Sequence, residues 1–306
     1  MTSTEQPSSR IVGLRRRAAN IALALAVMLL SAVVATRSAQ AQTFTLLYQF
    51  TGGMDGGNPL AGLVEDGTGN FYGTTSGGGV IGGTCKILQG CGGIFKLDAS
   101  GKETVLYSFG ATSVDGAYPY VGSLLRDSAG NLYGTTLSDL SQGAGTVFKL
   151  DPSGTETILH TFSFSTADGN SPYGTLVRDA AGNLYGVTNL GGTFGYGTVF
   201  KVDANNTETV LYNFSGTGGD GAEPGGGLVR DRAGNLYSTT TSGGGAYFGT
   251  VFKLDASGSE TILHSFSGSD GNLPAMGLVR NSKGSLFGTT LYGGAHGGGV
   301  VFKITP

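Results

Sequence analysis

The sequence is poor in charge, histidine and cysteine. Charged residues make up 13% of the 306 residues, about half the usual share, and there are only three His and two Cys. So few ligand-type side chains predict no metal site and no cofactor, and they give little support to Ser-His-Asp chemistry. The sequence therefore gives more information on the fold of the protein and on its export than on a reaction.

Glycine is abundant instead. The chain has 57 Gly and 8 Pro, together about 21% of the residues against a usual share near 12%. The glycines follow no three-residue period, which excludes collagen, and regular clusters of Val, Ile, Leu, Phe and Tyr argue against a disordered chain. This composition predicts an all-β domain of short strands joined by glycine-rich turns.

The N-terminus has the pattern of an export signal. Arg10 and Arg15 to Arg17 precede a mostly apolar run over residues 21–35, and Ala39 and Ala41 are the small residues that a signal peptidase reads. We expect a signal peptide at residues 1–41, the alternative being a retained anchor, for which the run is short. The mature chain, residues 42–306, would be periplasmic or extracellular.

The mature chain is acidic. Removal of five Arg and one Glu leaves 13 basic and 20 acidic residues, a net charge of about −7 with no basic cluster. We therefore expect no nucleic-acid partner, and no membrane association after signal removal. The two cysteines, Cys85 and Cys91, would be oxidised to a disulfide in an exported protein. A metal site is the alternative, and it would need ligands that lie far away in the sequence.

One sequence unit occurs five times. Its copies are marked by residues spaced 61, 52, 52 and 50 apart, and a period near 50 indicates a solenoid or a propeller. These markers are Asn70, Asn131, Asn183, Asn235 and Ser285. Each unit holds four strand-like pieces, of the types GLVRD, GNLYGTT, GTVFKLD and ETVLYSF, and four strands make one propeller blade.

The ends of the chain predict closure. Residues 43–50 match the fourth piece without the three pieces before it, whereas the last copy ends at the third piece, residues 299–305. Pairing these two segments would complete a fifth blade and hide both edges. We predict an all-β, monomeric five-bladed β-propeller over residues 42–306, with four antiparallel strands per blade and a ring closed by the N-terminal strand.

The unit resembles the GloVer (Gloeo/Verruco) extracellular tandem repeat of exported bacterial proteins. The resemblance rests on residues 183–186 (NLYG), on residues 197–201 (GTVFK) and on the glycines between them, and it extends over the mature chain. It implies export and an architecture similar to NHL-type propellers, in which the GLVRD strand is innermost. It implies no particular reaction, and the catalytic residues stay unknown.

Two sets of loops predict a binding face. Connections between second and third strands, and between blades, are long and differ between copies, and variable loops on a rigid scaffold often carry function. They include a DGxxP turn in every copy, whose aspartate we expect to be structural, although calcium or acid-base chemistry is an alternative. The aspartates are Asp55, Asp115, Asp168, Asp220 and Asp270.

Aromatic and polar residues of these loops are the binding candidates. An exposed tyrosine offers apolar area and a hydroxyl to a sugar or a protein surface, although the rings could instead pack locally over the glycines. The candidates are Tyr118, Tyr120, Tyr173, Tyr196, Glu223, Tyr247, Tyr292 and His296, with Phe194, Phe248 and Asn272 beside them. His160 and His264 replace a tyrosine of the outer strand and are expected to pack.

Three functions stay open at this point. The first is a binding module for glycans or another surface macromolecule, in which several similar sites act together. The second is a glycan hydrolase or lyase, which needs two carboxylates in unlike environments, for example Glu223 with one of the DGxxP aspartates. The third is a purely structural role. Arginines at the end of the innermost strand could line a central channel or pair with neighbouring turns.

Overall fold

The structure is a computed structural model, and it describes residues 43–80, 85, 90–112, 115–120, 122–138, 143–164 and 167–305. The chain divides into two compact units, Met1–Leu46 and Leu47–Pro306. The predicted signal peptide lies outside the described residues. Within the described ranges all regular structure is β-strand, and no helix is long and apolar enough to cross a membrane.

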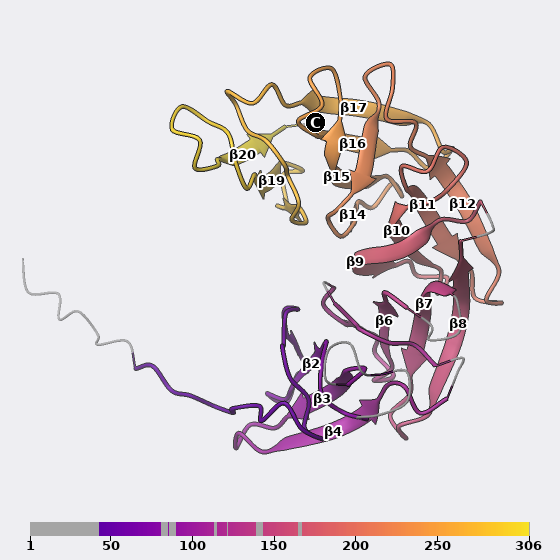
Figure 1. Ribbon diagram of the computed structural model, residues 1–306, viewed down its shortest axis with the longest axis vertical. Helices are drawn as coiled ribbons and strands as arrows, with labels where there is room; N and C mark the ends of the chain where they lie inside the picture. The colour runs from indigo at the N-terminus through magenta and orange to yellow at the C-terminus, as the bar shows by residue number, and fades with distance from the viewer. Residues whose placement is uncertain are drawn as a thin grey trace, which may run out of the picture. The chain divides into compact units, whose positions relative to one another are not determined.

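Five antiparallel sheets follow one another along the chain, and we number them repeats 1 to 5 (Figure 1). Repeat 1 consists of β1 (Val64–Glu65), β2 (Phe71–Thr75), β3 (Gly93–Leu97) and β4 (Glu103–Ser108). Repeat 2 consists of β5 (Leu125–Arg126), β6 (Leu132–Thr136), β7 (Gly143–Leu150) and β8 (Glu156–Ser163). Repeat 3 consists of β9 (Asn170–Arg178), β10 (Leu184–Leu190), β11 (Thr198–Val202) and β12 (Glu208–Asn213).

The last two sheets depart from four strands in opposite ways. Repeat 4 has five, namely β13 (Gly221–Pro224), β14 (Val229–Arg230), β15 (Leu236–Gly243), β16 (Thr250–Leu254) and β17 (Glu260–Ser265). Both β13 and β14 pair with β15. Repeat 5 has three, namely β18 (Val279–Arg280), β19 (Leu286–Thr289) and β20 (Val301–Ile304). The all-β prediction and the assignment of one sheet to each repeat are confirmed.

Short polar turns join the first strand of each sheet to the second. In repeat 2, Asp127 accepts hydrogen bonds from the amides of Ala129 and Asn131, the Asn131 side chain and the Tyr133 hydroxyl. The same set recurs around Asp66, where hydrogen bonds from Asn70 and Thr68 hold the pKa of the carboxyl well below its usual range. The asparagine that marks the repeat is thus a turn residue.

Consecutive sheets are joined by aromatic contacts. A phenylalanine at or just after the end of each outer strand packs edge-on against a phenylalanine of the third strand in the next sheet, with ring centroids about 5 Å apart. These pairs are Phe109–Phe148, Phe162–Phe200, Phe214–Phe252 and Phe266–Phe302. Phe50, which precedes the first sheet, makes the same contact with Phe95 at 4.9 Å. The cores between sheets are therefore one motif used repeatedly.

The repeated arginines also belong to these junctions. The guanidinium of Arg126 lies 5.5 Å from the ring centroid of Tyr72 in the preceding sheet, and Arg178 and Arg230 stack in the same way on Tyr133 and Tyr185. Of the two alternatives for these residues, the structure favours pairing with a neighbouring repeat, although the partner is a tyrosine ring instead of a turn.

The two ends of the sheet series carry exposed apolar side chains. Among the described residues, β20 pairs with β19 alone and residues 43–50 belong to no strand. Val301 is 82% exposed, whereas its equivalents Ile94, Val147, Val199 and Val251 are buried. Leu63 in repeat 1 is 52% exposed, whereas its equivalents in the other four repeats are buried. Ring closure is thus not among the observed strand pairs and stays a prediction.

Candidate binding site

Two kinds of loop meet at one edge of the sheets, which we call the long-loop edge. The glycine that ends a second-to-third-strand loop lies against the proline of the next DGxxP turn. A Cβ on Gly197 would come within 2.7 Å of Pro224 Cδ, and one on Gly249 within 2.6 Å of Pro274 Cδ. Glu223 and Leu273 donate backbone hydrogen bonds to Tyr196 and Phe248 of the preceding loop. Loops far apart in sequence thus form one continuous edge.

The residue before each DGxxP proline adopts a left-handed backbone conformation. Its φ lies between 54° and 60° in all five turns, although none of the five residues is glycine. They are Asn58, Tyr118, Ser171, Glu223 and Leu273. The same strained position therefore presents five different side chains.

The DGxxP aspartates are engaged within the scaffold. Asp115 accepts hydrogen bonds from the amides of Gly110 and Ala111 and from the Tyr107 hydroxyl. Asp55 and Asp220 accept from loop amides in the same way, and Asp168 and Asp270 bond His160 and His264 at 3.0 and 2.9 Å. These contacts join each outer strand to the next turn, which is a structural task. In the described part of the chain no group of three His, Cys, Asp or Glu side chains could hold a metal ion.

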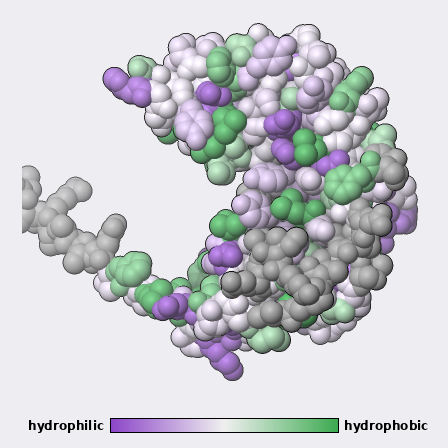
Figure 2. All heavy atoms as spheres, in the orientation of Figure 1, coloured by the Kyte–Doolittle hydropathy of each residue, from purple (hydrophilic) through white to green (hydrophobic). Residues whose placement is uncertain are grey.

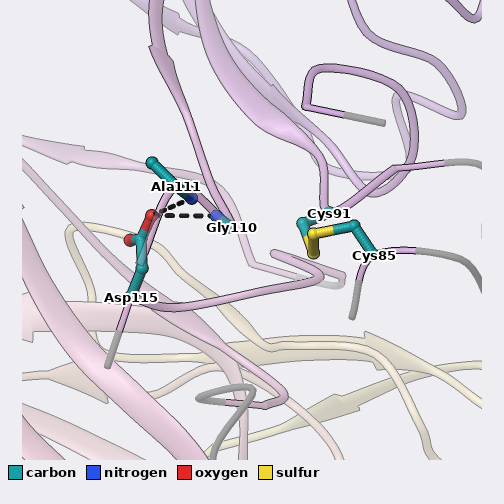
Figure 3. The surroundings of a disulfide bond; sticks show 5 residues. All are labelled: Cys85, Cys91, Gly110, Ala111 and Asp115. Atoms are coloured by element: carbon teal, nitrogen blue, oxygen red, sulfur yellow. Dashed lines mark hydrogen bonds between the residues drawn. A yellow bond between two sulfur atoms is a disulfide. The ribbon is translucent and has the colours of Figure 1, made fainter. Parts of the chain in front are cut away.

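Cys85 and Cys91 form the predicted disulfide, with their Cα atoms 5.0 Å apart (Figure 3). It covers Gly110, the residue that begins the loop to Asp115. In repeats 3 and 4 the rings of Tyr196 and Phe248 lie against Gly216 and Gly268, one position further along the corresponding loops. The disulfide therefore lies beside the loop that an aromatic ring contacts in repeats 3 and 4. Phe248 is half-buried in this contact, whereas Tyr196 is still 43% exposed.

Other candidate aromatics reach solvent. Tyr247 is 69% exposed and Tyr292 is 59% exposed, and both lie in second-to-third-strand loops, as do exposed Phe194 and His296. Tyr120 is exposed beside half-buried Tyr173. On the face drawn in Figure 2, separate hydrophobic and hydrophilic patches stand among surface of intermediate hydropathy.

The remaining candidates are held by the protein. Tyr118 packs half-buried against the core cluster that contains the disulfide, and burial raises its pKa. The Glu223 carboxylate accepts hydrogen bonds from Thr241 and Ser242 at 3.3 and 3.0 Å. The structure therefore separates the candidates into exposed rings, which a ligand can reach, and side chains that are packed in the core or hydrogen-bonded within the protein.

A cavity that the sequence analysis missed is lined by all five repeats. It measures about 400 Å³ and is bordered by residues that follow the DGxxP prolines. These include Leu60, Gly122, Gly174, Gly227 and Met276. Glycine and small residues expose backbone there, so the cavity offers hydrogen bonds but no acid or base. The glycines after each proline were the available signal.

The fold and these contacts define a class, that of all-β repeat proteins whose sheets are linked by aromatic junctions. The chain belongs to the Gloeobacter/Verrucomicrobia repeat family, which it matches over residues 32–164 and 120–306. The comparison with curated proteins finds no match.

Solved structures with a similar arrangement include a gluconolactonase from Xanthomonas campestris, at 15% identity and a TM-score of 0.49, covering 83% of this chain and 78% of that one. Another is the extracellular domain of a hybrid two-component system protein from B. thetaiotaomicron, at 14% identity and a TM-score of 0.48. That match covers 79% of this chain and 27% of the other. Neither similarity is high enough to assign an activity to this chain.

Proposed function

We propose that the chain is an exported binding protein, a closed five-bladed β-propeller that binds glycans through its long-loop edge. The observation that carries this proposal is the exposure of Tyr247 and Tyr292 on loops fixed by backbone hydrogen bonds. An exposed ring held by a rigid scaffold stacks on a sugar face with little loss of conformational entropy. The disulfide is compatible with an oxidising compartment.

Repetition supports a polymeric ligand. The loops of repeats 3, 4 and 5 close with the same backbone hydrogen bond, from the amides of Gly197, Gly249 and Gly299 to the carbonyl six residues earlier. Each therefore presents its own tip residues on one backbone frame. Several weak sites on one molecule gain strength together when the ligand also repeats.

Closure of the ring is part of the proposal. Phe50 contacts repeat 1 as Phe109 contacts repeat 2, and this contact supports the proposal that the segment before the first sheet is an outer strand. Beside it, Leu47, Leu63 and Phe95 line an apolar cavity of about 310 Å³. At the junction of repeats 2 and 3, the face of repeat 3 that corresponds to this cavity wall packs against Tyr133 and Val147 of repeat 2. The equivalents of those two residues are Phe287 and exposed Val301.

A glycan array with the mature protein tests the binding proposal. We expect binding that is lost in the double variant Tyr247→Ala, Tyr292→Ala and retained in Tyr247→Phe, Tyr292→Phe, because stacking needs the ring and not the hydroxyl. Binding unchanged by the alanine pair, or binding of a protein but of no glycan, contradicts the proposal. Release of reducing ends that is lost in Glu223→Gln would instead establish a hydrolase.

A further inference from the structure

Two cavities lie at equivalent junctions, away from the long-loop edge. One lies between repeats 1 and 2, measures about 270 Å³ and is bordered by the short turns at Gly130 and Gly154. The other lies between repeats 3 and 4, measures about 190 Å³ and is bordered by the short turns at Gly234 and Gly258. We call them the junction pockets. They lie where the two short turns of a repeat meet the sheet before it.

Each junction pocket brings two cations to one tyrosine ring. Lys96 lies directly across the strand pair from Tyr72, and Arg126 of the next repeat stacks on the same ring. Lys201, Tyr185 and Arg230 repeat this arrangement. Among the described residues, ion pairs are formed only by His160 and His264, so these lysines and arginines have no carboxylate at ion-pair distance. Beside each ring, Asp66 or Asp179 accepts a hydrogen bond from the tyrosine hydroxyl, but neither forms an ion pair with the two cations, whose like charges repel each other.

The arginines also hold unused donors. The Nε–H groups of Arg126 and Arg230 are buried and find no acceptor among the described residues. A buried donor without a partner is costly, and in a native protein it calls for a missing acceptor. One carboxylate borders each pocket, but Asp151 and Asp255 accept hydrogen bonds from their own turns. Two cations and one carboxylate line each pocket, which gives it a formal charge of +1.

The other walls are apolar. Leu106, Leu132 and Pro152 line the first pocket, and Leu211, Leu236 and Ala256 line the second. A cavity of about 150 Å³ holds one benzene molecule, so these volumes fit a single substituted six-membered ring. We propose that the junction pockets bind a ring-sized carboxylate, such as a hexuronic acid, with the carboxylate between the lysine and the arginine.

The chain contains its own control for this site. In repeat 5, Lys303 lies across from Phe287 in place of a tyrosine. The position of the arginine in repeat 1 is taken by Glu65, which pairs with Phe71 as Arg126 pairs with Leu132. Lys303 therefore occupies the equivalent position in its strand, but Phe287 replaces the tyrosine and Glu65 replaces the arginine. Because the junction pockets lie away from the long-loop edge, this proposal does not depend on the proposed function.

Titration of the mature protein with D-galacturonate, followed by the ¹⁵N–¹H signals of the arginine Nε–H groups, tests the proposal. We expect the Arg126 and Arg230 signals to shift in a saturable way at low salt, and D-galactose, which has the ring without the carboxylate, to leave them in place. Lys201→Gln should weaken binding at Arg230 about tenfold, because a charge-assisted hydrogen bond is lost. Lys303→Gln should change nothing.

Three results would overturn the proposal. One is the absence of any shift at millimolar galacturonate. Another is an equal response to galactose or to inorganic sulfate, since these would remove the need for the carboxylate or for the ring. The third is a loss in Lys303→Gln as large as in Lys201→Gln. Retained dispersion of the backbone amide signals in each variant shows that the fold is intact.

Discussion

Gly110 shows how closely single residues fit this scaffold. Its φ is +90°, and a Cβ there would collide with the sulfur atoms of both Cys85 and Cys91. Gly110→Ala should therefore cost about 3 kcal/mol or more, through backbone strain and displacement of the disulfide. Gly219→Ala is the control, because Gly219 has a φ of +93° and open space around it, and should cost about 1 kcal/mol. Thermal unfolding measures both, and equal losses would mean that the disulfide can move aside freely.

Three glutamates at the start of outer strands predict an unusual pH dependence. Burial, with a smaller contribution from a neighbouring aspartate, raises the pKa of Glu156, Glu208 and Glu260 to about 7. The folded state therefore holds protons that the unfolded state releases above about pH 4.5. Stability should fall as pH rises from about 4.5 to 7, and then level off.

The triple variant Glu156→Gln, Glu208→Gln, Glu260→Gln checks this origin. Between mildly acidic and neutral pH, the free energy of unfolding of this variant, measured with denaturant, should lose most of its dependence on pH. The difference from the unmodified protein should be of the order of 1 kcal/mol per group, because water screens part of each effect. The acid limb should persist, since hydrogen bonds lower the pKa of turn residues such as Asp66 and Asp98, and that stability is lost as pH falls below about 4. An unchanged slope in the variant would assign it to other groups.

At the scale of elements, the aromatic junctions should dominate stability. Phe214 is fully buried and contacts both Tyr212 and Phe252 at ring distances near 5 Å. We expect Phe214→Ala to cost about 3–5 kcal/mol, from the loss of buried area and the cavity that is left. Phe164, in the loop after β8, is 70% exposed, and Phe164→Ala should cost less than 1 kcal/mol. Chemical denaturation compares the two, and similar losses would contradict the junction model.

The sequence predicts the strands because each repeat carries the same alternation of apolar and polar residues. It predicts the long innermost strand less well. The GLVRD pieces yield only two paired residues in β1, β5, β14 and β18, whereas β9 begins inside its DGxxP turn. The glycine-rich backbone of neighbouring repeats meets there, as where a Cβ on Gly174 would lie 2.6 Å from the amide nitrogen of Gly227. Contacts between repeats, which no local pattern encodes, decide where pairing stops.

The candidate site was predictable in composition but not in geometry. Loop position identified Tyr247 and Tyr292, which are exposed, but it gave no means to tell them from Tyr118, which packs beside the disulfide. The turn chemistry of DGxxP assigns positive φ to glycine, whereas Glu223 and Tyr118 also adopt it. The junction pockets could not be predicted, because Lys96 and Arg126 meet only when two sheets are packed together.

At the scale of the whole molecule, the unpaired edge of β20 is the decisive feature. In repeats 1 to 4, the residue equivalent to Val301 pairs with the tyrosine or histidine of the outer strand, as Ile94 pairs with Tyr107 and Val251 with His264. The same register would place Tyr48 opposite Val301. An exposed strand edge of this kind invites association between chains unless it is covered. Closure within one chain covers it and buries Leu63 as well.

A cross-link tests closure directly. Cysteines opposite each other in an antiparallel pair have Cβ atoms close enough for a disulfide, so Tyr48→Cys with Val301→Cys should form an intramolecular bond under mild oxidation. It would close a loop of most of the chain and raise stability by several kcal/mol, about 5 in the chain-entropy model. Val105→Cys with Val301→Cys is the control and should keep free thiols, because Val105 already pairs with Phe95. Faster migration on a non-reducing gel and a mass two hydrogens lower identify the bond, whereas covalent dimers would mean that β20 is covered by a second chain.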